Sequence, residues 1–126
     1  MKKLTWLLRV VGIIQIVLGL SYLFMPDLFL QAMGHSLPQA DIHYPLAMLA
    51  ARFIAYGIAL LYIAKAPAQY RLWIHIMILI QVIDLAAGVA FTLMNVVPLS
   101  LSGFPMFNAV WIIALLWLWR PQVARA

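Results

Sequence analysis

The chain contains no cysteine and no glutamate, and charged residues make up only 9% of its 126 residues. The absence of cysteine excludes disulfides, thiolate nucleophiles and cysteine-bound metals. Asp27, Asp41 and Asp84 are the only acids, and no glycine-rich phosphate loop, nucleophile elbow or paired carboxylate occurs. The sequence therefore favours a protein that is not an enzyme, although it leaves enzymatic activity open.

Apolar residues are what the chain has in excess. Hydrophobic residues account for 67% of the sequence and the mean hydropathy is +1.06, whereas roughly half of the residues of a soluble domain are apolar. A water-soluble protein would need a polar surface that this composition cannot supply. We therefore expect one membrane domain whose apolar faces contact the lipid bilayer.

Four apolar segments are long enough to cross the bilayer, which takes roughly 20 apolar residues in a helix. They cover residues 4–25, 46–64, 71–95 and 102–119. Prolines, which remove a backbone donor, mark their ends at Pro26, Pro45, Pro67, Pro98 and Pro121. Since a backbone in lipid must satisfy its own hydrogen bonds, we predict an all-α fold, an antiparallel four-helix bundle that spans the membrane.

The charges predict the orientation of these spans. The formal net charge is +5, and most basic residues flank one set of segment ends, namely Lys2, Lys3, Lys65, Arg71, Arg120 and Arg125. The connections 26–45 and 96–101 contain neither lysine nor arginine. By the positive-inside rule both termini face the cytoplasm. No basic stripe with aromatic platforms accompanies the charge, so we expect no nucleic-acid partner.

The first span begins after Lys2 and Lys3, as the apolar part of a signal peptide would. Arg9 interrupts it, however, and no small-x-small cleavage site follows. We therefore expect an uncleaved anchor. Arg9 lies close to the end of the span, so its long side chain can reach the lipid head groups.

The longest connection, residues 26–45, is expected on the outer side. Residues 26–33 indicate a short helix with Asp27 in its first turn and Gly34 just past its end, and its apolar residues would lie in the membrane interface. The rest of the connection holds three side chains of types that bind zinc or copper, His35, Asp41 and His43. Their spacing defines no ligand geometry, so we expect no metal site.

Small residues recur on faces where helices in lipid can approach closely. The first span has Gly12 and Gly19 on one stripe, and Ala87 or Gly88 serves the third. The second span repeats alanine at every fourth residue, at Ala47, Ala51, Ala55 and Ala59. We expect these faces to form the contacts between helices. A homodimer made through the alanine stripe is left open.

Arg52 and Asp84 lie at nearly the same depth of the second and third spans, close to the middle of the bilayer. A charge there costs roughly 2.5–3.5 kcal/mol on insertion scales, so such residues normally turn inward and find partners. Other polar residues near this depth are Gln15, Tyr56, Gln81 and Asn108. In one interpretation these six residues line a cavity that binds a polar head, a quinone or a proton. In the other, Arg52 and Asp84 pair, and the rest complete a network that fixes the helix register.

The order of several residues resembles a known family. The residues that carry the resemblance are Arg9-x-x-Gly12, Gly19 and Pro26 in the first span and Ala51-Arg52-x-x-Ala55-Tyr56-Gly57 in the second. In these features the chain is similar to the small bacterial DoxX-like and BphX-like four-span membrane proteins. The resemblance implies a multi-pass protein of the bacterial cytoplasmic (inner) membrane, associated with quinone-linked redox complexes or with the catabolism of aromatic compounds. This chain lacks the cysteines that a thiol-redox role would require.

Three functions agree with these features. The one that we favour is a small integral membrane accessory or binding protein, in which Arg52 and Asp84 anchor a small amphipathic ligand or the bundle docks on a larger membrane complex. The second is a subunit of a quinone-linked redox complex, in which Asp84 or His75 relays a proton. The third is a small transporter for a hydrophobic or cationic compound, with Asp84 as its charge site. The cofactor is unknown, and a quinone is the one candidate.

Overall fold

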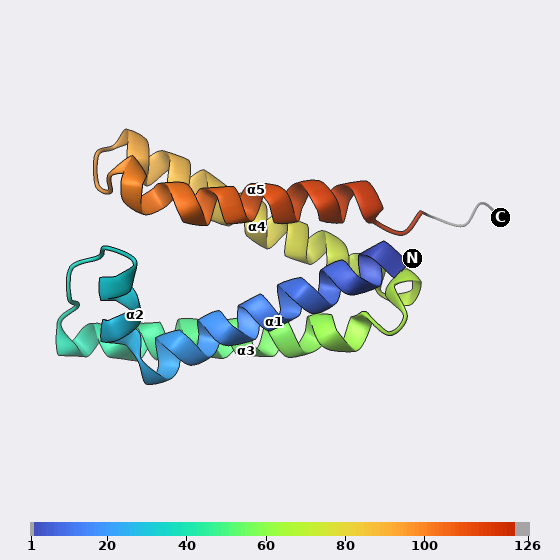
Figure 1. The fold of residues 1–126 in the computed structure, drawn as a ribbon, viewed down its shortest axis with the longest axis horizontal. Coiled ribbons are helices and arrows are strands. Elements are labelled where there is room, and N and C mark those ends of the chain that lie inside the picture. Colours follow the sequence, from blue (N-terminus) through green and yellow to red (C-terminus); the bar gives the residue numbers. More distant parts are fainter. Residues whose placement is uncertain (1, 123–126) are drawn as a thin grey trace. The chain divides into compact units, whose positions relative to one another are not determined.

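The computed structural model describes residues 2–122, and in this range every regular element is a helix (Figure 1). The four long helices are α1 (Lys2–Phe24), α3 (His43–Ile63), α4 (Arg71–Leu93) and α5 (Leu99–Trp119). Shorter helices connect them, namely α2 (Pro26–Ala32), η1 (Ala40–Ile42) and η2 (Pro67–Tyr70). The predicted all-α chain with four long apolar helices is confirmed.

The four long helices are each long and apolar enough to cross a membrane. In the most apolar window of each, a third or less of the residues are buried inside the protein. Most of the apolar side chains therefore face outward, which in water would cost roughly 25 cal/mol for every Å² exposed. A bilayer removes that cost. The chain thus has the construction of a multi-pass membrane protein.

The helix limits differ from the predicted ones mainly beside prolines. α3 begins at His43 rather than at residue 46 and includes Pro45 in its first turn. α5 begins directly after Pro98 rather than at residue 102. Proline is tolerated in the first helical turn because its missing N–H has no acceptor within the helix there. In these two helices, proline lies within the first turn or directly before it.

Two helices end in left-handed caps. Gly34 follows α2 with φ +92°, and Asn95 follows α4 with φ +60°. After α2, the backbone N–H of His35 donates to the carbonyl oxygen of Leu30 at 2.9 Å, and the equivalent bond closes α4. These bonds define the Schellman motif, in which glycine or asparagine adopts the left-handed conformation at least cost. The helix end predicted at Gly34 is confirmed.

The internal contacts divide the chain into two compact units. The α1–α3 unit covers residues 8–65 and contains most of α1 with α2 and α3. The α4–α5 unit covers residues 66–122 together with the start of α1, residues 2–7. The helix α1 therefore begins in one unit and continues into the other.

Glycines bring α1 and α3 to backbone contact (Figure 1). A Cβ atom added to Gly57 would lie 2.6 Å from the carbonyl oxygen of Gly12, and one added to Gly12 would lie 2.9 Å from the carbonyl oxygen of Gly57. Two turns further along α1, a Cβ atom on Gly19 would lie 2.9 Å from the carbonyl oxygen of Ala50. The glycine stripe predicted on the first span is therefore the α1 side of this contact.

The predicted alanine stripe of α3 is not the surface that meets α1. Ala50 and Gly57 take that place, whereas Ala51 and Ala55 are exposed within the described chain. Glycine lets two backbones approach more closely than alanine does, so α3 turns the face with Gly57 toward α1. A repeat of small residues identifies a face without identifying its neighbour.

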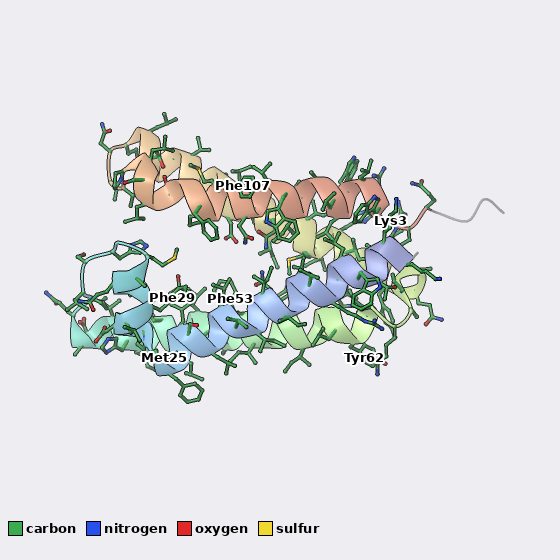
Figure 2. The ribbon with its side chains drawn as sticks, viewed as in Figure 1. Lys3, Met25, Phe29, Phe53, Tyr62 and Phe107 are labelled. Atoms are coloured by element: carbon green, nitrogen blue, oxygen red, sulfur yellow. The ribbon has the colours of Figure 1, made fainter. Side chains whose placement is uncertain are left out.

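Aromatic side chains attach α2 to the helices of its own unit. The ring of Tyr22 lies edge-on to Phe29 with centroids 4.9 Å apart, and it stacks on Phe53 at 5.9 Å. Phe29 and Phe53 are labelled in Figure 2. Leu30 on the same short helix is buried. Edge-on and stacked pairs at these distances add to the stability gained from burial.

α4 and α5 form an antiparallel hairpin along most of their length (Figure 1). Gly88 faces Met106, whose Cγ would lie 2.6 Å from a Cβ atom at position 88. Near the turn of the hairpin, the hydroxyls of Thr92 and Ser102 are 2.7 Å apart. Pro105 lies inside α5 and leaves the carbonyl one turn earlier without its usual N–H partner.

Candidate functional site

Arg52 lies in the middle of α3 with its side chain exposed. Its guanidinium donates one hydrogen bond within the α1–α3 unit, from Nη1 to the carbonyl oxygen of Met48 at 2.9 Å. A guanidinium has five N–H donors. Most of the hydrogen-bonding capacity of Arg52 is therefore not used by its own unit.

Gln15 and Tyr56 lie at the same level of the α1–α3 unit as Arg52. The contact of Gly12 with Gly57 sets the register of this antiparallel pair. Residue 15 is three residues past Gly12, which puts it level with residue 54, halfway between Arg52 and Tyr56. Gln15 is only 4% exposed, and Tyr56 is half-buried. One unit thus holds three of the predicted site residues within about one helical turn.

Asp84 occupies a comparable place in the middle of α4. Its carboxylate is exposed, and it has no hydrogen-bond or ion-pair partner among the described residues of the α4–α5 unit. The bond between Thr92 and Ser102 sets the register of the hairpin. This register puts Asn108 level with Ala86, two residues from Asp84. The hairpin therefore holds a free carboxylate and an amide at one level.

Gln81 and Asn108 are each oriented by a residue of their own helix. Gln81 is 3% exposed, and its Nε2 donates to the thioether sulfur of Met77 at 3.5 Å, which is a weak acceptor. Asn108 Oδ1 accepts a hydrogen bond from Trp111 Nε1 at 3.0 Å. Each amide thus has one side-chain contact within its own helix.

The six predicted site residues fall into two sets of three, one in each unit. The first set is Gln15, Arg52 and Tyr56, and the second is Gln81, Asp84 and Asn108. The pairing of Arg52 with Asp84 joins residues of different units and stays a prediction. A guanidinium only donates hydrogen bonds and a carboxylate only accepts them. The first set is thus suited to an anion or a carbonyl oxygen, and the second to a cation or a hydroxyl.

A side-chain contact in the connection between α1 and α3 was missed by the sequence analysis. His43 Nε2 lies 2.8 Å from Asp27 Oδ1, which joins the first turn of α2 to the first residue of α3. Within residues 2–122, no three side chains of the types that bind metals come together as a possible metal site. His43, considered above with His35 and Asp41, therefore bonds to an acid outside that set. The sequence offered one signal for this contact, an acid at the start of one helix and a histidine at the start of the next.

A second polar contact that the sequence analysis missed closes the α4–α5 hairpin. Thr92 Oγ1 donates to the carbonyl oxygen of Gly88 at 2.6 Å and lies 2.7 Å from Ser102 Oγ. Ser102 Oγ also donates to the carbonyl oxygen of Pro98 at 3.3 Å, so each hydroxyl is bonded both to its own helix and to the other hydroxyl. The signal in the sequence was two hydroxyl residues at similar distances from a short turn.

His75 lies near the start of α4 beside an aromatic ring of α5. The centroid of its ring is 6.4 Å from that of Trp117, and its side chain is half-buried. Nine residues of α4 separate it from Asp84, which is about 14 Å along a helix. The two residues, each named above as an alternative proton relay, therefore lie at different levels of α4.

Comparison of the chain with protein-family models, with curated proteins and with solved structures finds no match. The resemblance to the DoxX-like and BphX-like proteins stays a prediction.

Proposed function

We propose that the protein is a small integral membrane binding or accessory protein, whose polar groups at mid-span hold a small amphipathic molecule or a polar group of a larger membrane complex. The supporting observation is unpaired charge in the middle of two spans. Arg52 and Asp84 are both exposed, and neither has an ion-pair partner within its own unit. Each therefore needs a polar partner, which the lipid hydrocarbon does not supply.

The position of these residues along their helices supports this proposal. Arg52 precedes the last residue of α3 by eleven residues, and Asp84 follows the first residue of α4 by thirteen. At roughly 1.5 Å per residue they lie about 16 Å and about 20 Å from those helix ends. In a hydrocarbon core about 30 Å thick, the short side chain of Asp84 cannot reach the head groups.

We propose the binding test with two single variants, Arg52→Ala and Asp84→Asn. Each is expected to lower the melting temperature in detergent or to reduce the amount of a small molecule that can be extracted from the purified protein and identified by mass spectrometry. Lys65→Ala removes one charge at an exposed position outside the helices and is the matched control. If both variants have the melting temperature of the wild type and yield the same amount of extracted molecule, Arg52 and Asp84 do not belong to the proposed site.

A charge exchange separates ligand binding from a purely structural ion pair. In the double variant Arg52→Asp/Asp84→Arg both charges are kept but their places are reversed. If the two residues only pair with each other, the double variant should regain the melting temperature of the wild type. The wild type and the double variant should then yield the same extracted molecules. If they hold a ligand, the small molecule found in the wild-type extract should be absent from the extract of the double variant, even where its melting temperature recovers.

We also propose that the four helices form a bundle in the bacterial cytoplasmic membrane, with both termini inside and α2 at the outer interface. The distribution of lysine and arginine supports this orientation. Because the natural chain has no cysteine, single cysteines can report it directly. A membrane-impermeant maleimide added to intact cells should label the Gln39→Cys variant and not the Gln69→Cys variant, both at exposed positions. The opposite pattern would reverse the proposed orientation.

A further inference from the structure

A basic pocket lies at one end of the α4–α5 unit, between the first turn of α1 and the end of α5. It has a volume of about 440 Å³ and is lined by Lys2, Lys3, Leu4 and Trp119. Lys3 Nζ lies 5.8 Å from the centroid of the Trp119 ring, and Lys3 is labelled in Figure 2. The volume falls in the range of small-molecule sites, roughly 300–1,000 Å³. The pocket is thus large enough for a head group and combines cations with an apolar wall.

Two further cations lie at the same end of the unit. The guanidinium of Arg120 lies 3.6 Å from the ring centroid of Trp117. Arg71 is the first residue of α4, one turn before His75, whose ring contacts Trp117. The Nε atom of Arg71 is buried and has no hydrogen-bond partner in the described chain. A buried donor without an acceptor is unfavourable, so Arg71 Nε would gain from an acceptor supplied by a ligand.

Within residues 2–7 and 66–122, no acidic side chain lies at this end of the unit. The single acid in its described residues is Asp84, thirteen residues along α4 from Arg71, which is about 20 Å. The described part of the unit therefore has four cations at this end, Lys2, Lys3, Arg71 and Arg120, and no acidic side chain beside them. The repulsion between these cations falls when an anion binds among them.

We propose that this pocket binds the head group of an anionic phospholipid. The lysines pair with the phosphate, Arg71 supplies a further donor at the same end, and Leu4 and Trp119 contact the glycerol and the first carbons of the acyl chains. Basic pockets between spanning helices are suited to anionic head groups, and tryptophan favours this amphipathic layer of the membrane. The site makes no use of Arg52 or Asp84 and goes beyond the function proposed above.

The lining favours an anionic phospholipid over two related ligands. A free phosphate would use the cations but would leave Leu4 and Trp119 without a partner. A zwitterionic phospholipid would bring its own ammonium group into a cluster that already holds excess positive charge. The cations of the pocket therefore favour anionic over zwitterionic lipids. Its apolar wall, Leu4 and Trp119, favours a lipid over free phosphate.

The test is a titration of the full chain in detergent, followed by native mass spectrometry. The probes are phosphatidylglycerol and phosphatidylcholine with identical acyl chains. We expect phosphatidylglycerol to bind roughly tenfold more tightly, and Lys3→Ala to weaken its binding about fivefold, the factor that corresponds to about 1 kcal/mol for each cation near an anionic lipid. Lys3→Arg keeps the charge and should bind as the wild type does.

Two controls decide whether this pocket is responsible. Lys65→Ala removes the same charge from an exposed position that does not line the pocket, and it should change the affinity less than twofold, which is well below the effect expected for Lys3→Ala. Trp119→Leu should weaken the binding of phosphatidylglycerol, although it leaves the charge of the protein unchanged. Circular dichroism and melting temperature establish that each variant is folded, and Lys3→Gln replaces Lys3→Ala if the latter is not.

Three results would overturn the proposal. The first is equal affinity for the two lipids. The second is an equal loss in Lys65→Ala and Lys3→Ala, since general surface charge would then explain the binding. The third is displacement of the lipid by glycerol phosphate at the concentration of the lipid itself, because the ligand would then be the soluble phosphate and the apolar wall would have no role.

Discussion

The two units hold their helices together by different means. In the α1–α3 unit, Gly12 and Gly57 let two backbones touch, and a Cβ atom at either position would meet a carbonyl oxygen. In the α4–α5 unit, a Cβ atom on Gly88 would meet the Cγ and sulfur atoms of the Met106 side chain and no backbone atom of α5. A backbone in a helix cannot move aside without moving the helix, whereas a methionine can change rotamer. The first contact should therefore tolerate substitution much less than the second.

The largest expected effect is that of Gly57→Ala. The new Cβ atom would lie 2.6 Å from the carbonyl oxygen of Gly12 and 2.5 Å from Ile16 Cγ1, so α1 and α3 must separate. Overpacking of this kind costs typically about 1–3 kcal/mol. The free energy of unfolding, measured by titration with a denaturing detergent, should fall by that amount.

A double variant checks that the loss comes from this contact. Gly12→Ala and Gly57→Ala disturb the same pair of backbones, so Gly12→Ala/Gly57→Ala should cost less than the sum of the two single variants. Additive losses, or a wild-type free energy of unfolding in Gly57→Ala, would show that the glycines do not hold the two helices together.

A smaller loss is expected in the hairpin for Thr92→Val. The hydroxyl of Thr92 lies 2.7 Å from that of Ser102, and hydrogen bonds between membrane helices contribute about 0.6 kcal/mol on average and up to about 1.7 kcal/mol. A cycle of Thr92→Val, Ser102→Ala and the double variant should give a coupling energy in that range. A coupling energy of zero would leave apolar packing as what joins α4 and α5.

The contact of Asp27 with His43, between α2 and α3, should contribute less again. The side chains of Asp27 and His43 are 52% and 39% exposed, and exposed pairs contribute about 0.2–1 kcal/mol. Asp27→Asn and His43→Gln should therefore each lower the free energy of unfolding slightly, and salt should reduce the difference from the wild type. A loss as large as that of Gly57→Ala would mean that α2 contributes to holding the α1–α3 unit together.

Much of the fold could be predicted because lipid restricts the backbone to few choices. Long apolar segments in a bilayer must be helices, and Gly34 signals the end of α2 because glycine adopts the left-handed conformation freely. The face that α3 turns toward α1 could not be predicted in the same way. The alanine repeat and Gly57 lie on different faces of one helix, and only the shape of the neighbour decides between them.

The candidate site could be predicted at the level of residues but not of partners. Depth along an apolar segment identifies Arg52 and Asp84 as residues in need of a polar neighbour. Contacts such as that of Asp27 with His43 depend on how a loop folds back, which periodicity does not encode. The side-chain bond from Gln81 to Met77 was equally hidden, since a thioether is seldom considered an acceptor.

The smallest effect is expected for Gly88→Ala, although its clash distance matches that of Gly57→Ala. The new Cβ atom would lie 2.6 Å from Met106 Cγ and 3.0 Å from its sulfur, and both atoms can move by a change of rotamer. Gly103→Ala, where no atom lies within 4 Å of the new Cβ, measures the gain in helix propensity alone and is the matched control. We expect Gly88→Ala to differ from this control by less than about 0.5 kcal/mol, the usual limit for substitutions outside tightly packed contacts. A loss equal to that of Gly57→Ala would show that the methionine is as rigid as a backbone, and the contrast between the two units would then lie in their hydrogen bonds alone.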